Sequence, residues 1–128
     1  MQTCDIPHDQ WHSFLDDFSR RHAGECVSIE ALEGQNGRHA LASNVRLVGI
    51  TDDPKNSEGE MIEVMAGESP DSQTNHEVRS PRAVRVACGD DGREMAVEIE
   101  SGSMPTTLVL FGGPDWAQSV YGPSTKPL

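Results

Sequence analysis

The chain has 128 residues, of which 35% are hydrophobic and only 5% aromatic, and its formal net charge at pH 7 is -11. This length fits a single domain with one core, and the core must consist mainly of aliphatic side chains because aromatic ones are few. A strongly acidic chain repels phosphate backbones and anionic lipid surfaces. Neither nucleic acid nor a membrane is therefore expected as a partner.

The polar N-terminus lacks the basic and apolar segments of a signal peptide, and no stretch has the length and apolarity of a membrane span. A cytoplasmic location is therefore expected. The cysteines Cys4, Cys26 and Cys88 form no CxxC pair, and free thiols are typical of that compartment. Cys26 and Cys88 fall in expected strands and are predicted to be buried, whereas Cys4 is predicted to be exposed.

The strongest local signal is a helix at about residues 7–23, within the stretch from Asp5 to Gly24. Four apolar residues recur at the spacing i, i+3, i+4 and i+7, which places them on one helix face: Trp11, Phe14, Leu15 and Phe18. Gly24 is expected to end the helix in a left-handed conformation. Because such a helix is marginal alone in water, it must cover a surface that the rest of the chain provides.

Alternating apolar and polar residues then predict a β meander over about residues 25–111. The expected strand segments are 25–32, 38–51, 60–67, a short one near 77–78, 83–87, 95–100 and 106–111. Asn36-Gly37 predicts a tight hairpin turn. Ser43-Asn44 predicts a bend or bulge in the long second segment. Pro81 marks a break, because proline cannot donate to a strand ladder.

The expected fold class is α+β, with one N-terminal helix packed on a strongly bent antiparallel sheet or small barrel of five to six strands. The apolar helix face is expected to cover strand residues of the core: Val27, Ile29, Val64, Val97, Ile99 and Leu108 or Val109. Residues 112–128, rich in Gly and Pro, are expected to form a C-terminal tail. In this tail Trp116, Val120 and Tyr121 have roughly helical spacing and predict a short turn that docks on the body or on a partner.

Several motifs together resemble one family. They are I-P-x-x-x-W-x-x-F-L-x-x-F-S-R-x-H from Ile6 to His22, L-x-G-I-T from Leu47, A-G-E-x-P-D from Ala66, Asn75-His76, P-x-x-V-R-V from Pro81, V-E-I-E from Val97 and the T-T-L strand from Thr106. The pattern resembles a family of small bacterial proteins of unknown function and covers most of residues 5–111. The chain departs from it at Cys26, where an aromatic residue is expected. The resemblance implies no activity, cofactor or catalytic residue.

A second resemblance concerns only the fold. Sm-like and SH3-like small barrels also place a helix before a bent five-stranded sheet. The RNA-reading residues and basic loops of the Sm family have no clear match in this chain, and its acidic charge argues further against RNA binding.

One candidate metal site lies on the expected helix. His8 and His12 are four residues apart and share a helix face, and Asp16 follows one turn later. Two imidazoles at this spacing chelate divalent metals, with a carboxylate as third ligand. There is no H-E-x-x-H arrangement and no obvious fourth ligand. A solvated polar face is the competing interpretation.

A candidate ligand site combines a basic helix end with a basic segment around Pro81. His22, His76, Arg79 and Arg82 are the groups expected to bind an anion or small ligand if the fold brings them together beneath the helix. The competing interpretation is that the arginines pair with surplus surface carboxylates, each pair contributing about 0–1 kcal/mol.

Sequence motifs for common chemistries are missing. The chain has no G-x-S-x-G, no phosphate-binding glycine loop and no dinucleotide-binding motif, so no cofactor is expected. The adjacent carboxylates, Asp52-Asp53 among them, are expected to be solvated in loops or on the helix. We therefore expect a non-enzymatic β module that binds a protein partner or associates with itself as a homodimer. The alternative is a ligand-binding or catalytic pocket near His22, His76 and Arg79.

Overall fold

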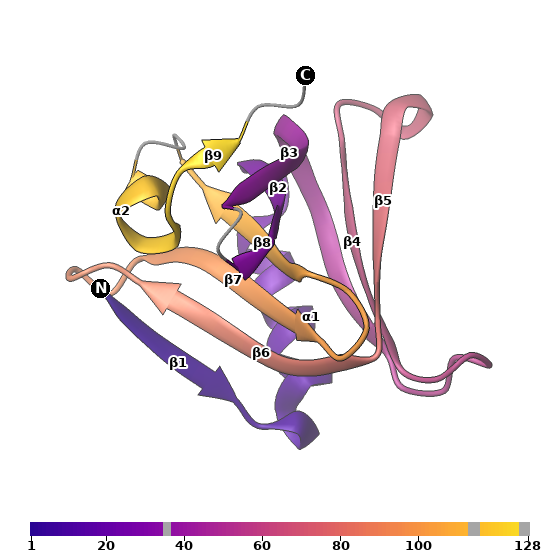
Figure 1. Ribbon diagram of the computed structural model, residues 1–128. Coiled ribbons are helices and arrows are strands. Elements are labelled where there is room, and N and C mark those ends of the chain that lie inside the picture. Colours follow the sequence, from indigo (N-terminus) through magenta and orange to yellow (C-terminus); the bar gives the residue numbers. More distant parts are fainter. Residues whose placement is uncertain (35–36, 113–115, 126–128) are drawn as a thin grey trace.

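The computed structural model describes residues 1–34, 37–112 and 116–125. In Figure 1 the long helix α1 (Trp11–His22) lies behind a sheet. The hairpin of β4 (Met61–Gly67) and β5 (Gln73–Arg79) stands at an angle to the rest of that sheet. The elements in chain order are β1 (Gln2–Ile6), α1 (Trp11–His22), β2 (Cys26–Leu32), β3 (Arg38–Asp53), β4 (Met61–Gly67), β5 (Gln73–Arg79), β6 (Pro81–Cys88), β7 (Glu94–Ser101), β8 (Thr106–Phe111), α2 (Ala117–Tyr121) and β9 (Ser124–Thr125).

The sheet confirms the expected α+β class in broad form, but the expected five to six strands are too few. Within the described residues, eight strands follow one open path, β1-β6-β7-β8-β2-β3-β4-β5, and β9 pairs in parallel with β3 outside it. The pairings along the path are antiparallel. The additional strand β1 has mainly exposed side chains, so it carries no alternating apolar pattern that reveals a strand.

The helix α1 begins later than the sequence predicts. Residues Gln2–Ile6 form a strand, and a 3₁₀ turn at His8–Gln10 follows Pro7 before α1 starts at Trp11. The helix ends at His22, and Gly24 has a φ of +85°, which confirms the predicted left-handed position. Because Gly lacks a Cβ atom, it adopts this conformation without steric cost.

The long strand β3 changes partner along its length. Its first part pairs with β2, and its second part, from Leu47 to Asp53, pairs with β4. Val27 lies opposite Val45 and Ile29 opposite Ala42, so two residues of β3 face one of β2. These two are Ser43 and Asn44, and Asn44 has a φ of +54°. The predicted bulge is confirmed, and it turns the sheet at this point.

The main core lies between α1 and the sheet. Trp11, Leu15 and Phe18 are buried, whereas Phe14 is only partly buried. Of the predicted strand contacts, all belong to this cluster except Leu108: Val27, Ile29, Val64, Val97, Ile99 and Val109. Leu108 belongs instead to a second cluster, with Leu110, Ala87, Ala96 and Ala117.

The C-terminal segment packs on its own chain, as one of the two alternatives from the sequence predicts, and docking on a partner stays a prediction. Trp116 and Tyr121 pack against the second cluster. The Trp116 indole N–H donates to the Phe111 carbonyl at 2.9 Å, and the Tyr121 hydroxyl donates to Glu98 at 2.5 Å. Burial and this hydrogen bond raise the pKa of Tyr121. The region 112–128 thus contains a short helix and a strand, and its aromatic side chains are occupied within the chain.

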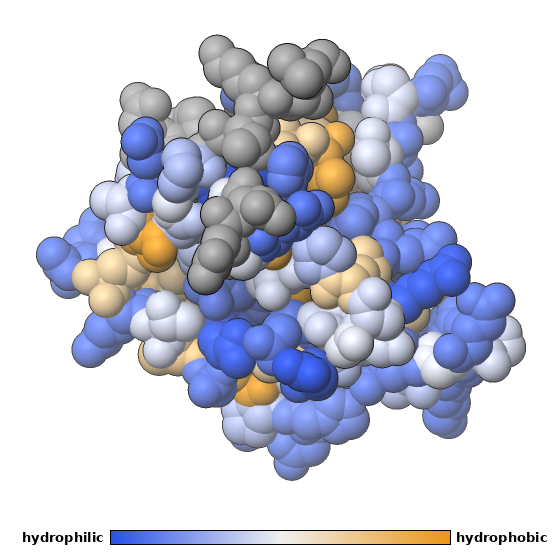
Figure 2. Space-filling model, viewed as in Figure 1, coloured by the Kyte–Doolittle hydropathy of each residue, from blue (hydrophilic) through white to orange (hydrophobic). Residues whose placement is uncertain are grey.

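The surface of the molecule is mainly hydrophilic on the face shown in Figure 2. Figure 2 shows one face on which hydrophobic residues form small separate patches among hydrophilic ones. Among the described residues, no helix has both the length and the apolarity needed to cross a membrane.

Candidate functional site

The edge of β3 that β2 leaves free is occupied by α1. The hydroxyl of Ser19 accepts a hydrogen bond from the Ile50 N–H at 2.8 Å and lies 3.1 Å from the Ile50 carbonyl. It also donates to the Leu15 carbonyl at 2.7 Å. Ser19 therefore substitutes for a neighbouring strand and satisfies backbone groups that would otherwise be unpaired.

A pocket of about 180 Å³ lies beside this contact, between α1 and β3. It is lined from α1 by His12, Asp16 and Ser19, from β3 by Val48, Gly49, Ile50, Thr51 and Asp52, and from β4 by Met65. Gly49 helps to create the space. A Cβ atom at this position would lie 3.5 Å from the Ser19 hydroxyl and 3.9 Å from the Met65 methyl group, so even a small side chain would occupy part of it.

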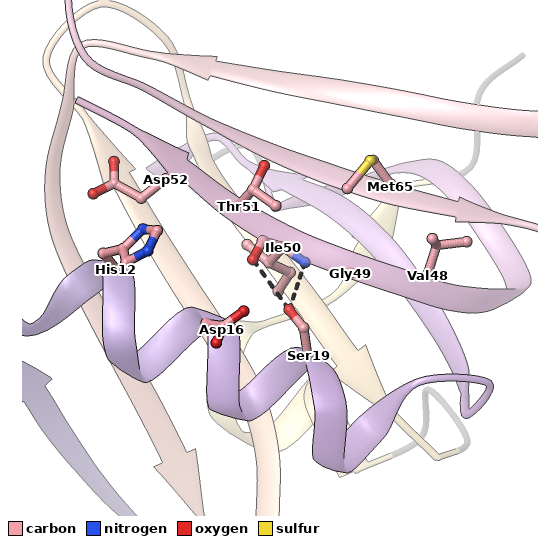
Figure 3. Close-up of a pocket in the computed structure, with 9 residues that line it drawn as sticks. All are labelled: His12, Asp16, Ser19, Val48, Gly49, Ile50, Thr51, Asp52 and Met65. Atoms are coloured by element: carbon pink, nitrogen blue, oxygen red, sulfur yellow. Dashed lines mark hydrogen bonds between the residues drawn. The ribbon is translucent and has the colours of Figure 1, made fainter. Parts of the chain in front are cut away.

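The two ends of the pocket differ in polarity. In Figure 3 His12 and Asp52 lie near each other at one end, with Asp16 on the next turn of α1, whereas Val48 and Met65 lie toward the other end. One end therefore presents carboxylates and the other presents apolar groups. Such a pocket fits a ligand with a cationic end and an apolar body.

The polar end continues into a pair of carboxyl groups. Asp52 is the penultimate residue of β3, and its side chain interacts with that of Glu60, just before β4. Partial burial, followed by this hydrogen bond and the charge of Glu60, raises the pKa of Asp52 from 3.8 to about 6. Asp52 Oδ1 and Glu60 Oε2 are buried and receive no hydrogen bond from the described residues. One proton held between two carboxyl groups makes one of them a donor to the other.

Histidines flank this carboxyl pair. His8 Nε2 lies 2.7 Å from Glu60 Oε1, and this hydrogen bond and the charge of Glu60 raise the pKa of His8. The charges of both His8 and His12 act on Asp52 in the opposite direction to burial and lower its pKa. A carboxyl group that keeps its proton near pH 6 beside a pocket is chemically suited to proton transfer or to hydrogen bonding a polar ligand.

The three predicted metal ligands do not lie together in the structure. His8 precedes α1 and contacts Glu60, while His12 and Asp16 lie on α1 and line the pocket. Asp16 also pairs with Arg20 at 3.3 Å. In the part of the chain that the structure describes, no group of three or more His, Cys, Asp and Glu side chains is arranged to hold a metal ion. The metal site remains a prediction that this geometry does not support.

His22 is held in a closed network at the end of α1. Its ring contacts those of Phe18 and Phe111, at centroid distances of 4.4 and 4.7 Å, and these two rings also contact each other. Its Nδ1 lies 2.7 Å from Glu25 and its Nε2 lies 2.7 Å from Glu94. Because carboxylates already occupy both ring nitrogens, His22 is not available to an anion.

Arg21 belongs to the same network. It pairs with Glu94, and its Nε donates to Asp17 at 2.8 Å. These hydrogen bonds raise the pKa of Arg21. Burial alone would raise the pKa of Glu94, but the hydrogen bonds from Arg21 and His22 outweigh burial and lower it.

The other predicted ligand residues lie elsewhere. His76, on β5, lies 2.9 Å from the Thr107 hydroxyl, and burial lowers its pKa. Arg79 is exposed at the end of β5, and Arg82 lies 3.5 Å from Glu100. Since His22 contacts Glu25 and Glu94 whereas His76 contacts Thr107, the two histidines share no partner among the described residues. Pairing of arginine with surface carboxylates describes Arg82 better than an anion site does.

Sequence reasoning missed most of the pocket. Asp52 was expected in a solvated loop, but it belongs to β3 and is partly buried. Glu60, Gly49 and Met65 carried no signal, because only the pairing of β3 with β4 and the approach of α1 bring them together. The L-x-G-I-T motif did include Gly49 and Ile50, but no sequence pattern connects them with a site.

Comparison with known proteins identifies the family of this chain. The model of a family of unknown function, DUF5335, matches residues 2–120. No curated protein and no solved structure matches this chain. The family match confirms the expected resemblance to an uncharacterised family, while the likeness to Sm-like and SH3-like barrels stays a prediction.

Proposed function

This chain belongs to the DUF5335 family, whose function is unknown, and we propose that it binds a small ligand with a cationic end and an apolar body. The pocket between α1 and β3 is the proposed binding site. The observation that carries the proposal is the division of this pocket into an acidic end, at Asp16 and Asp52, and an apolar end, at Val48 and Met65.

The size of the pocket limits the ligand. A cavity of about 150 Å³ holds a benzene molecule, and this pocket measures about 180 Å³. One ring or a short branched chain therefore fits, with a protonated amine directed at the carboxylates. The net charge of -11 also attracts cations and repels anions over the whole surface.

The experiment compares three probes of one shape and different charge: benzylammonium, benzyl alcohol and benzoate. Titration calorimetry and ¹⁵N-edited NMR spectra of the full chain report affinity and position. We expect benzylammonium to bind most tightly and to shift amide signals of residues 48–52. Equal binding of benzyl alcohol would remove the role of the cation. Binding of none of the probes, or shifts located elsewhere, would overturn the proposal.

Two variants on neighbouring helix positions sharpen this test. Asp16→Asn removes a carboxylate that lines the pocket, whereas Asp17→Asn makes the same charge change outside it. Both aspartates pair with arginine on α1, so the two changes are well matched. Loss of one partly exposed ion pair of about 1 kcal/mol corresponds to roughly fivefold weaker binding. We expect this loss for Asp16→Asn and no comparable loss for Asp17→Asn.

The interaction module inferred from the sequence is a second proposal: a non-enzymatic protein that binds a protein partner or a second copy of itself. Two exposed apolar side chains on β3, Leu41 and Val48, support it. Single exposed apolar residues are common on soluble proteins, so this support is smaller than that for the pocket. Light scattering over a range of concentrations tests self-association, and a monomer mass at every concentration would contradict a homodimer.

A further inference from the structure

Two of the three cysteines come together where β1 runs along β6 (Figure 1). Gln2 lies opposite Cys88, and Cys4 lies opposite Val86. Side chains two residues apart on a strand share a face, as do residues that lie directly opposite each other. Cys4 and Cys88 are therefore diagonal neighbours on one face of the sheet.

Both thiols border the same open space. A cavity of about 410 Å³ is lined by Cys4 and Cys88 together with Gln2 and the residues of the β6–β7 turn, Gly89, Asp90 and Gly92. Cys4 is exposed, Cys88 is partly exposed, and neither forms a disulfide. An ion or small molecule from solvent can therefore reach both sulfur atoms.

The spacing favours a bridging ion over a disulfide. Diagonal neighbours on antiparallel strands have Cα atoms about 7–8 Å apart, whereas a disulfide prefers about 5.5–6 Å. A disulfide joins its sulfurs by a single bond of about 2.05 Å. A metal ion between two thiolates holds the two sulfur atoms roughly twice a metal–sulfur bond of about 2.3 Å apart. Because this sulfur–sulfur distance is longer than a disulfide bond, a metal ion suits Cα atoms that lie farther apart.

The number of ligands selects the kind of ion. Zinc in structural sites takes four ligands, and no described group of three or more His, Cys, Asp and Glu side chains is arranged for a metal. Soft thiolate ligands favour Cu(I), which is satisfied by two thiolates in line.

We propose that Cys4 and Cys88 form a two-coordinate site for a soft, thiophilic metal ion, with Cu(I) as the ion that fits it. Two thiols bind one Cu⁺ and release two protons, giving a bis-thiolate complex with a charge of minus one. No oxidation or reduction takes place in this step. The site joins the N-terminal strand β1 to β6, and it is separate from the pocket between α1 and β3.

The experiment titrates the reduced full chain with Cu(I) under anaerobic conditions, in competition with a chromophoric Cu(I) chelator. We expect one ion per chain, and a loss of affinity of at least about a hundredfold when either Cys4→Ser or Cys88→Ser removes one of the two ligands. Cys26→Ser is the matched control, because Cys26 is also an exposed free thiol but contacts Asn44 on β3. This variant should bind as the unchanged chain does.

Each other result overturns the proposal. Retained affinity in Cys4→Ser or Cys88→Ser would show that the two thiols do not act together. Loss in Cys26→Ser would place the ion elsewhere, and failure of the unchanged chain to compete with the chelator would show that no such site exists. Circular dichroism and the binding of benzylammonium, which should be unaffected, check that the serine variants keep the fold.

Discussion

Trp11 fixes the junction between β1 and α1. Its side chain is only 2% exposed, and its indole N–H donates to the Ile6 carbonyl at 2.9 Å. The His8 ring packs against it edge-on, at a centroid distance of 4.5 Å. Trp116 donates in the same way to the Phe111 carbonyl, at the end of β8. In both places an indole N–H donates to the last carbonyl of a strand that precedes a helix.

Replacement of Trp11 is expected to be the most damaging change on α1. Trp11→Ala should lower the free energy of unfolding by about 3–5 kcal/mol, because it leaves a large cavity in the core. Trp11→Phe keeps most of the buried ring and loses the indole hydrogen bond, so a smaller loss of about 1–2 kcal/mol is expected. Urea denaturation followed by far-ultraviolet circular dichroism measures both.

Phe14 provides the control on the same helix. The apolar spacing suggests that Phe14 and Trp11 are equally buried, but Phe14 is only partly buried in the structure. Phe14→Ala is therefore expected to destabilise the protein clearly less than Trp11→Ala does. Equal losses for these two alanine variants would contradict the burial described.

Among the elements, β3 has the largest influence on the pocket. Pairing with β2 continues past the bulge at Ser43 and Asn44 as far as Arg46. From Leu47 onward, β3 pairs with β4 on one edge and contacts α1 on the other. This change of partner leaves Gly49 beside Ser19 and carries Asp52 to the acidic end. The position of the carboxyl pair is thus a consequence of how β3 bends.

The carboxyl pair makes the stability depend on pH. The pKa of Asp52 is about 6 in the folded protein and 3.8 ordinarily, so the folded state holds this proton more strongly than the unfolded state does. Its contribution to stability is complete below about pH 3.8 and is lost as the pH rises through 6. Allowing for screening by solvent, the loss is on the order of 1 kcal/mol.

Asp52→Asn isolates this contribution. An asparagine amide donates to Glu60 at every pH, so the variant should lose the fall in stability between pH 4 and pH 6 and should be the more stable protein at pH 7. Asp53→Asn, at an exposed neighbouring position, should retain that fall. Denaturation midpoints at several pH values measure the difference. Parallel curves for the unchanged chain and Asp52→Asn would show that the shared proton does not contribute.

The sequence predicts those elements whose signal is local. Val27 and Ile29 alternate with polar residues, Asn44 tolerates a positive φ, and the strand at residues 106–111 ends in four consecutive apolar residues, so each reveals its own structure. The strand β1 is different, because its side chains are exposed and its partner β6 is about eighty residues away. No local pattern carries such a pairing.

The candidate site was difficult to predict for the same reason. His12 and Asp16 were identified from helical spacing, and both line the pocket. Asp52 and Glu60 were not identified, because their contact depends on the hairpin of β3 and β4, whose length and register the sequence leaves open. Cys26 was expected to be buried in a strand, but it lies at the exposed start of β2. Alternation predicts which residues share a face, and it does not predict which face is covered.

For the whole molecule, the C-terminal segment contacts β7, β8 and the start of β3. Arg38, at the start of β3, is 2% exposed and pairs with the buried Glu30 at 2.6 Å. Its Nε donates to the Gly122 carbonyl at 3.0 Å, and its backbone N–H donates to the Pro123 carbonyl at 3.1 Å. The Gly122 carbonyl thus helps to satisfy a buried charge that would otherwise be costly, and the Pro123 carbonyl satisfies a backbone N–H.

Truncation after residue 111 tests this role. It removes the helix α2 that covers Leu108 and Leu110, and it removes two carbonyl partners of Arg38. A loss of roughly 3 kcal/mol or more in the free energy of unfolding is expected from the exposed apolar area and lost hydrogen bonds. Because Trp116 and Tyr121 are occupied within the chain, light scattering should give the same number of chains per particle before and after truncation. A dimer that becomes a monomer would instead assign the segment to self-association.

Point variants keep this test informative if the shortened chain does not fold. Tyr121→Phe removes only the hydrogen bond to Glu98 and should lower the stability by about 1 kcal/mol. Val120→Ser changes a side chain that is 42% exposed and should stay within about 0.5 kcal/mol of the unchanged protein. The opposite order, with Val120 the more sensitive, would mean that the exposed side of α2 is covered in solution, and a second copy of the chain would then be the first occupant to test by light scattering.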